Sequence, residues 1–325
     1  MENKTIRWGI IGLGNIAHKF AKDLLTINDC ELYAVASRTQ DKADEFASKY
    51  NVTKAYASYK DLANDPNIDA VYIATPHVFH KENSILCLKK GIAVLCEKPF
   101  AMNADEVEQM IACAKENNAL LMEALWTYFH PHYQYVLDVI KNKTYGKVLK
   151  LEADFGFVVE PDETSRTYNK SLGGGSLLDI GIYPIFVALS NFGMPNDIEA
   201  KGTFFENGAD SSCDMVFKYD DFNAYLQSTF LANTPVEATF TCEKAIVKIN
   251  RMFHIPTTVS IIDNNGKEEI KDFGYDTIGY NFEAIHFNQL IRENKKESNI
   301  MTFDFSRKLI RLLDDVSKAI GLTYK

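Results

Sequence analysis

A glycine-rich turn near the start of the chain has the residue types that bind a pyrophosphate. Gly12, Gly14 and Ala17 are spaced as G-x-G-x-x-A, between an apolar run and a helical stretch. Gly12 permits a tight turn, and Gly14 lets the backbone approach an anion that the N–H groups at a helix start can bind. Because the motif has its required context, we expect a dinucleotide to contact Gly12, Gly14, Asn15 and Ile16.

The next apolar run ends in Ser37 and Arg38, where an NAD enzyme usually carries Asp or Glu for the ribose 2'-hydroxyl. An arginine is a planar cation that suits a 2'-phosphate and can stack on adenine. The sequence therefore predicts that Ser37 and Arg38 contact NADP(H), which is preferred, with NAD(H) as the second choice. The alternative interpretation of Arg38 is a solvated charge at a strand end.

A lysine follows another predicted parallel strand in the segment Cys96-Glu97-Lys98-Pro99. Ligands bind at the carboxyl ends of the strands in such sheets. We expect Lys98 to meet the nicotinamide end of the cofactor, Glu97 to orient its ammonium, and Pro99 to fix the exit of the chain. The alternative is a surface ion pair between Glu97 and Lys98.

Three glycines, residues 173–175, precede a third group of candidate residues. They let the backbone approach a ligand closely, and Ser176 is expected to cap the apolar helix that follows. In that helix Asp179 and Tyr183 are four residues apart, so both are predicted to point from one face. Burying an acid and a phenol in an apolar helix costs free energy, so both residues are candidates for a functional role.

These groups fit the oxidation of a secondary alcohol, which needs a hydride acceptor and a base for the hydroxyl proton. Tyr183 is a weak base, with an unperturbed pKa near 10. An ammonium beside it favours phenolate and polarises the substrate oxygen, so Tyr183 would exchange the proton and Lys98 would tune it. A mechanism in which Lys98 carries the proton and Tyr183 donates a hydrogen bond stays open.

Two kinds of strand pattern divide the chain. Up to Trp126, short apolar runs alternate with helices, which is typical of a parallel sheet. After Trp126, longer alternating runs with turn signals predict an open, mostly antiparallel sheet. We therefore expect an α/β fold with a dinucleotide-binding Rossmann domain at residues 1–125 and an α+β domain for substrate binding and oligomerisation at residues 126–325. The strands are expected at 6–11, 31–36, 70–75, 93–96, 119–123, 147–158, 198–205, 212–218, 223–231, 237–242, 245–250 and 257–263.

The composition of the 325 residues is that of a soluble globular protein, with 46% hydrophobic and 24% charged residues. A net charge of -9 argues against nucleic acid as a partner. No apolar run of membrane-spanning length is expected, and residues 1–6 leave no room for a signal peptide, so we expect a cytoplasmic protein. The six cysteines lack C-x-x-C spacing and accompany no histidine cluster, which favours buried thiols over disulfides or a metal site.

With these motifs in this order, the chain resembles the Gfo/Idh/MocA family over its whole length, and its Tyr183 favours the dimeric dihydrodiol dehydrogenase branch. The resemblance implies that Lys98 and Tyr183 are the catalytic pair and that Asp179 lies in the substrate site. It also implies that residues 75–77 (Thr75, Pro76 and His77) lie against the nicotinamide ribose, and that the substrate is a sugar, a cyclitol or a vicinal diol. A homodimer or homotetramer through the second sheet is the expected assembly.

Aromatic residues near the predicted cleft are candidates for the substrate pocket, because their rings pack on sugars and aromatic diols. Trp126 at the domain junction is the first candidate, followed by Phe155 and Tyr280. Two other functions share the fold: an NAD(P)-binding sensor without catalysis, and a reductase of linear tetrapyrroles. Lys98 and Tyr183 favour an enzyme over the sensor, while the natural substrate and the direction of reaction stay open.

Overall fold

The computed structural model describes residues 4–324, which form two compact units. Unit 1 extends to Trp126 and includes Asp276–Arg307, and unit 2 comprises Thr127–Tyr275 and the chain from Lys308 onward. The predicted division after residue 125 placed 276–307 in the second domain. This segment belongs to unit 1 because its helix α8 (Tyr280–Arg292) packs against α1 (Asn15–Leu24). Residues 1–3, part of the start expected to lack a signal peptide, lie outside the described residues.

Unit 1 contains a parallel sheet, as predicted, with six strands in the order β3-β2-β1-β4-β5-β6; the sequence did not indicate the three-residue strand β3. The central strands are buried on both faces, which explains their continuous apolar runs. The order reverses between β1 and β4, and ligands bind beside such a point at the carboxyl ends of the strands. The strands are β1 (Ile6–Ile11), β2 (Cys30–Ala36), β3 (Lys54–Tyr56), β4 (Ala70–Ile73), β5 (Ala93–Glu97) and β6 (Leu121–Ala124).

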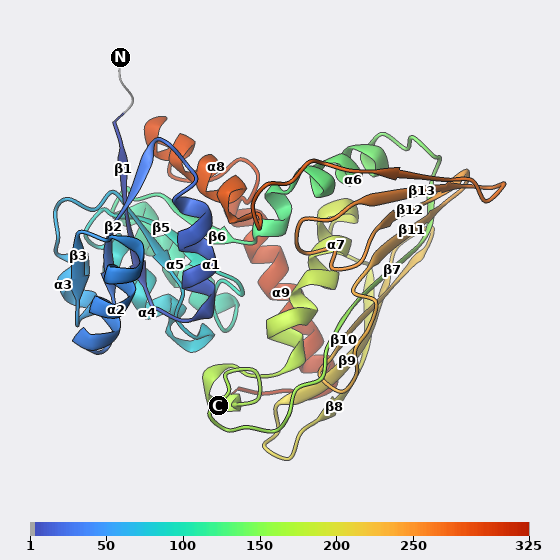
Figure 1. Ribbon diagram of the computed structural model, residues 1–325. Coiled ribbons are helices and arrows are strands. Elements are labelled where there is room, and N and C mark those ends of the chain that lie inside the picture. The colour runs from blue at the N-terminus through green and yellow to red at the C-terminus, as the bar shows by residue number, and fades with distance from the viewer. Residues whose placement is uncertain (1–3, 325) are drawn as a thin grey trace. The chain divides into compact units, whose positions relative to one another are not determined.

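The helices of unit 1 cover this sheet (Figure 1). Helix α4 packs against α3 and α5, and α2 packs against β2 and β3. Side chains cap two of the helices: Ser58 accepts from Asp61 N at 3.3 Å, and Asn103 accepts from Glu106 N at 3.0 Å. The remaining helices are α2 (Gln40–Tyr50), α3 (Tyr59–Ala63), α4 (His80–Leu88) and α5 (Ala104–Glu116).

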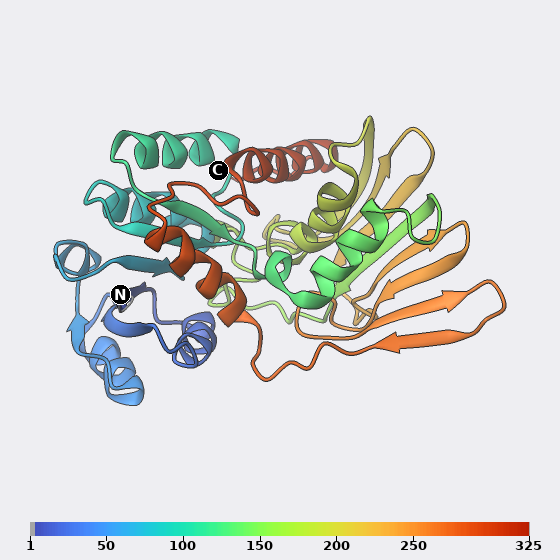
Figure 2. The same cartoon turned by 90° about the horizontal axis from the view of Figure 1, so that it is seen from above.

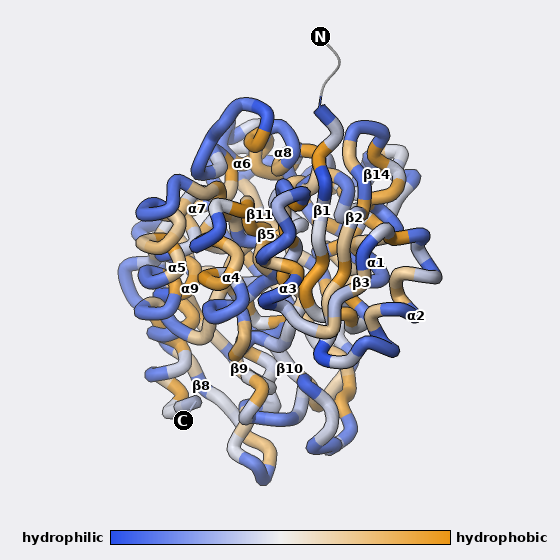
Figure 3. Tube along the Cα trace, turned by 90° about the vertical axis from the view of Figure 1, so that its left-hand side faces the viewer, coloured by the Kyte–Doolittle hydropathy of each residue, from blue (hydrophilic) through white to orange (hydrophobic). Residues whose placement is uncertain are grey.

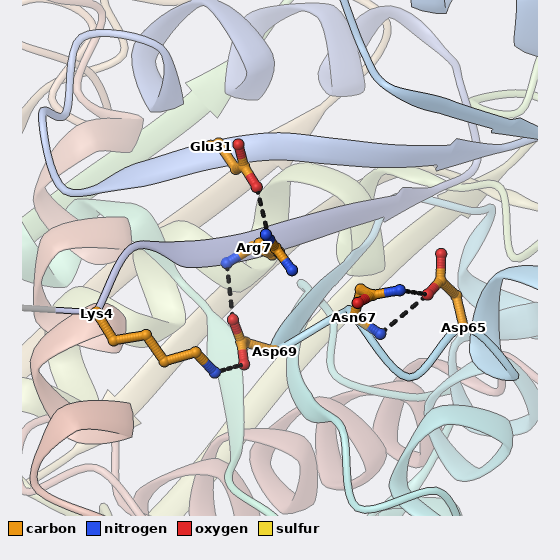
Figure 4. A network of polar contacts seen from close by, with 6 residues as sticks. All are labelled: Lys4, Arg7, Glu31, Asp65, Asn67 and Asp69. Carbon is orange, nitrogen blue, oxygen red and sulfur yellow. Dashed lines mark hydrogen bonds and ion pairs between the residues drawn. The ribbon is translucent and has the colours of Figure 1, made fainter.

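A polar network ties β1 to its neighbours near the start of the strands (Figure 4). Arg7 Nε donates to Glu31 on β2 at 2.8 Å, and Arg7 N donates to Asp69, which precedes β4, at 3.0 Å. Lys4 Nζ pairs with Asp69 at 2.5 Å. Exposed pairs of this kind contribute about 1 kcal/mol at most, so the network helps to fix register at the end of the sheet away from the ligand-binding edge.

Unit 2 contains an eight-stranded sheet in the order β14-β13-β12-β11-β7-β10-β9-β8. Only β7 and β10 pair in parallel, so the sheet is mostly antiparallel, as predicted. The sequence did not indicate β14, because all four of its residues are exposed and it lacks an alternating pattern. The strands are β7 (Val148–Gly156), β8 (Asp197–Phe204), β9 (Asp210–Lys218), β10 (Asn223–Thr229), β11 (Ala238–Cys242), β12 (Ala245–Ile249), β13 (Val259–Asp263) and β14 (Glu268–Lys271).

Helices α6 (Pro131–Lys141) and α7 (Ile182–Phe192) lie on one face of this sheet (Figures 1 and 2). Helix α7 packs on β7 and β10, and α6 packs on β12. Buried and exposed residues alternate along β9 and β10, as expected of strands with one covered face. The last helix of the described residues is α9 (Phe303–Ile320).

One stretch, Lys170–Phe192, is apolar and long enough by composition to span a membrane, which differs from the sequence expectation. Its most apolar window is 94% buried inside the fold. The reason is that α7 forms the core beneath the sheet of unit 2. In unit 1 the apolar residues follow the strands, and many turns and helix surfaces are hydrophilic (Figure 3).

The cysteines have the environment predicted from the sequence, with one difference. Cys30 is half-buried, and the other five are buried free thiols. Within residues 4–324, no group of three or more His, Cys, Asp and Glu side chains could hold a metal ion.

Candidate active site

The glycine turn joins β1 to α1 and leaves the start of α1 open to an anion. Gly12 adopts φ +89°, and a Cβ there would lie 2.9 Å from the backbone of Ala74. Gly14 is the residue before the helix, and a Cβ there would meet nothing within 4 Å. No side chain caps this helix in the described structure, so its first N–H groups remain free for a ligand.

Arg38 follows the end of β2, beside the glycine turn. Ser37 is buried and its N–H donates to Tyr56 O at 3.1 Å, which pins this loop to β3. Arg38 itself is exposed. Burial raises the pKa of the Tyr59 phenol, and the charge of Arg38 opposes this rise. Tyr59 is thus a neighbour of Arg38 that the sequence analysis missed, because it lies on α3, about twenty residues further along the chain.

The loop after β4 carries Thr75, Pro76 and His77, and a buried histidine connects it to the lysine segment. His80 approaches Thr75 O at 2.8 Å through Nε2 and Pro99 O at 2.9 Å through Nδ1. Asn83 Nδ2 donates to Thr75 Oγ1 at 3.2 Å. Sequence analysis missed His80 and Asn83, whose positions on α4 resemble those of ordinary core residues.

Lys98 follows the carboxyl end of β5 and is half-buried. The Glu97 carboxylate accepts from the hydroxyl of Tyr72 and from Lys98 N, the latter at 3.2 Å. Phe100 N donates to Glu123 at 3.0 Å. Burial raises the pKa of Glu123 to about 7. The acids at the ends of β5 and β6 therefore hold the backbone on both sides of the lysine, a positioning role that the sequence did not indicate for Glu123.

Two of the three predicted pocket aromatics are stacked in unit 1. The rings of Trp126 and Tyr280 lie 4.0 Å apart with an interplanar angle of 16°. Tyr280 N donates to Asp23 on α1 at 2.8 Å, which fixes the start of α8. One turn later, burial raises the pKa of Glu283 well above its usual range. Neither Glu283 oxygen has a hydrogen-bond partner among the described residues, which disfavours the charged form of this acid.

In unit 2 the acid of the glycine-rich segment forms an ion pair. Asp179 is 4% exposed, and one of its oxygens lies 2.8 Å from Nη1 of the half-exposed Arg166. The segment Leu177–Gly181 is a π-helical turn, and the α-helix begins only at Ile182. The expectation of one regular helix is therefore wrong for its first turn, because Asp179 lies in a wider π-helical turn and Tyr183 in the α-helix.

The prediction that Ser176 caps this helix is also wrong. Ser176 has α-helical backbone angles, and its hydroxyl donates to Asp210 at 2.8 Å. The same Asp210 oxygen accepts from Leu177 N at 2.7 Å, so the cap comes from strand β9. Asp210, 34 residues after Ser176, replaces the local cap because the sheet brings its carboxylate to the start of the helix.

Tyr183 lies in a cluster of rings in unit 2. Its ring centroid is 5.6 Å from that of Phe155, near the end of β7, and 5.1 Å from that of His254. The Phe155 and His254 rings are 4.4 Å apart. Thr127 Oγ1 donates to His254 O at 2.8 Å, which holds this loop. The sequence gave no signal for His254, which lies outside any motif.

The predicted site residues therefore form one group in each unit. Unit 1 brings the glycine turn, Arg38, the loop after β4 and the lysine segment to the carboxyl edge of its sheet, and also contains the stacked rings of Trp126 and Tyr280. Unit 2 contains Asp179, Tyr183 and Phe155. The first group has the parts of a dinucleotide site, and the second has an acid, a phenol and apolar rings.

Comparisons with known proteins agree with this division. Residues 6–125 match the family model described as "Oxidoreductase family, NAD-binding Rossmann fold", and residues 133–248 match the "GFO/IDH/MocA C-terminal domain". A trans-1,2-dihydrobenzene-1,2-diol dehydrogenase of Xenopus tropicalis is 37% identical over 331 residues, which covers 98% of this chain and 99% of the relative. The scyllo-inositol 2-dehydrogenase (NADP(+)) IolU of Bacillus subtilis is 34% identical over 325 residues and 98% of each chain.

A similar solved structure has the same two-part architecture. It is that of KijD10, a 3-ketoreductase from Actinomadura kijaniata, in complex with NADP and TDP-benzene. The match has a TM-score of 0.86 and 26% identity, and covers 98% of each chain.

Proposed function

Because the chain belongs to the GFO/IDH/MocA oxidoreductase family, we propose that it transfers a hydride between NADP(H) and a secondary alcohol or carbonyl of a sugar, cyclitol or vicinal diol. The family establishes an NAD(P)-dependent oxidoreductase that acts on alcohol groups. The observation that carries the finer proposal is the presence of Lys98 at the end of β5 and of Tyr183 in the ring cluster of unit 2. A cofactor-binding sensor would need neither group.

The described residues fit a dinucleotide at the edge of the first sheet. The uncapped start of α1 and the open space at Gly14 would receive the pyrophosphate. The loop after β4, Glu97 and Lys98 would border the nicotinamide end, and the bound cofactor would supply the hydride acceptor or donor. Arg38 is exposed, and neither of the residues beside it in the sequence, Ser37 and Thr39, is acidic. A cation without an adjacent carboxylate supports binding of NADP(H) over NAD(H).

The remaining roles follow from the chemistry of the side chains. Tyr183 would take the proton of the substrate hydroxyl during oxidation and return it during reduction. The Lys98 ammonium would stabilise negative charge on the phenol and on the reacting oxygen. Asp179 would accept a hydrogen bond from a further substrate hydroxyl. In the alternative assignment Lys98 carries the proton and Tyr183 donates a hydrogen bond.

The substrate class rests on the candidate aromatic residues and on the relatives. Phe155 and Asp179 of unit 2 would supply an apolar ring and a polar contact, and Trp126 and Tyr280 are the candidate rings of unit 1. A cyclic compound with hydroxyls on one side and C–H groups on the other matches this combination. The names of the relatives above include an inositol and a dihydrodiol as substrates, which supports testing both classes.

The test is turnover of NADPH or NADP with a panel of sugars, inositols and vicinal diols. We expect activity with at least one polyol or its ketone, and a higher kcat/KM with the phosphorylated cofactor. In Lys98→Met, turnover should fall by about 10²-fold or more while NADPH affinity is retained. Lys89→Met, at the exposed end of α4, is the matched control.

Tight NADPH binding without turnover of any panel member would refute the catalytic proposal and favour the sensor. Reduction of a linear tetrapyrrole instead of the polyols would favour the third candidate function. Wild-type turnover by Lys98→Met would remove the lysine from the mechanism.

A further inference from the structure

The chain after α9 returns to the glycine turn that precedes Asp179. Gly321 ends the helix with φ +74°, and Leu322 N donates to Ser317 O at 2.8 Å. Leu322 is buried, which anchors the tail in unit 2. Two residues later, the partly buried Tyr324 donates from its hydroxyl to Gly174 O at 3.0 Å. A tyrosine far from the motif in sequence thus holds one carbonyl of the turn.

Asp210, the first residue of β9, binds the residues that directly follow the same glycine turn. It is fully buried, and one carboxylate oxygen accepts from Ser176 Oγ and Leu177 N. Ser176 Oγ also lies 3.0 Å from Ser228 Oγ on β10. These bonds satisfy the first donors of the helical segment that carries Asp179, so the sheet fixes its start.

Gly175 makes room for both holding groups. Its φ is +128°, and a Cβ there would collide with Asp210 Oδ1 and lie 3.2 Å from the hydroxyl of Tyr324. Asp210 Oδ1 has no hydrogen-bond partner among the described residues. Burial raises the pKa of Asp210, which disfavours its charged form.

We propose that Asp210 and Tyr324 are positioning residues that clamp the glycine turn from the sheet and from the tail, and thereby set the place of the Asp179 carboxylate. The inference rests on the proposed function in one respect, namely that Asp179 binds a substrate hydroxyl. It adds the tail residues 322–324 to the parts of the chain on which substrate affinity depends. Arg166 Nη1 lies 2.8 Å from Asp179 Oδ1, so an ion pair also holds this carboxylate.

The first experiment measures the turn itself and needs no activity. Hydrogen–deuterium exchange of peptides that cover residues 173–182 should be faster in Tyr324→Phe and Asp210→Asn than in the wild type. Thr323→Ala, an exposed neighbour on the same tail, is the control and should exchange like the wild type. Unchanged exchange in Tyr324→Phe would overturn the clamp, whether or not the enzyme reaction is found.

The second experiment separates positioning from general stability. With the best substrate of the panel, Tyr324→Phe should raise KM about fivefold, the effect of one lost hydrogen bond, while the Kd of NADPH stays unchanged. In an Asp179→Asn background the same change should raise KM by less than about twofold, because the groups act in series. An unchanged KM in Tyr324→Phe, or an undiminished rise in the double variant, would refute the role through Asp179.

Discussion

Arg38 is the residue on which we propose that cofactor choice depends. If it pairs with the 2'-phosphate, Arg38→Ala should weaken NADP binding by about 1.5–3 kcal/mol, the range for a hydrogen bond to a charged group. NAD affinity should change little, because NAD has no phosphate at this place. Titration of both cofactors by fluorescence measures the effect, with Arg7→Ala, at the other end of the sheet, as control. Equal affinity of the wild type for the two cofactors would contradict the preference.

Tyr183 is the residue on which we propose that the proton transfer depends. Tyr183→Phe keeps the ring contacts with Phe155 and His254 but removes the hydroxyl. Turnover should fall by about 10²–10⁴, the usual contribution of a general acid or base, while folding and NADPH binding persist. The wild-type oxidation rate should rise with pH as the phenol loses its proton, and this rise should be absent in the variant.

Tyr145→Phe, in the same unit, is the control for the loss of a phenol. If Tyr183→Phe keeps both the rate and the pH profile, the base is another group, and Lys98 becomes the first candidate.

At the scale of the elements, we expect the two glycines between β1 and α1 to have different roles, Gly12 in stability and Gly14 in cofactor binding. Gly12→Ala should destabilise the protein by at least about 1–3 kcal/mol, because φ +89° is strained for alanine and the methyl would meet the backbone of Ala74. Gly14→Ala should leave stability nearly unchanged, since nothing lies within 4 Å. Its methyl should instead lower NADPH affinity by blocking the approach of the pyrophosphate.

Chemical unfolding and cofactor titration of both variants measure this separation. Gly91→Ala, which has φ +74° and open space around its Cβ, isolates the cost of the backbone angle. A Gly14→Ala protein that binds NADPH like the wild type would place the pyrophosphate elsewhere.

At the scale of the whole molecule, the outer face of the second sheet is the predicted contact between subunits. Tyr225 on β10 is 46% exposed and pairs in register with Val216 on β9, and both belong to the outward-facing set of their strands. Ile246 on β12 is a further partly exposed apolar residue of the same sheet. Many other positions of this face are polar and include the ion pairs Lys150–Glu152 and Lys218–Asp197, so these three side chains are apolar contacts that a second subunit would cover.

The double variant Tyr225→Asp and Ile246→Asp should therefore sediment as a monomer, whereas the wild type should sediment as a dimer or tetramer. Analytical ultracentrifugation measures the masses, and retained NADPH binding shows that the variant is folded. Lys143→Asp, on an exposed turn after α6, is the control. A monomeric wild type would refute the predicted assembly.

Local sequence was enough to predict much of this protein. The glycine turn, five of the six strands of the first sheet and seven of the eight strands of the second were predicted, because they depend on patterns within about ten residues. Gly12 was identifiable because its backbone angle excludes other residues, and Lys98 because it directly follows a strand. These residues act through neighbours in sequence, so a local pattern defines their environment.

Only the tertiary structure decided which distant groups support the site. Ser176 meets Asp210, 34 residues away, and Tyr324 meets Gly174, 150 residues away. Helix α8 belongs to unit 1 because its apolar face packs against α1. The sequence pattern of a helix indicates that one face is buried, but not which element covers that face. A buried polar group takes the partner that the fold brings within hydrogen-bond distance, which is why the sequence alone assigned Ser176 to a local cap and left Asp210, His254 and Tyr324 unidentified.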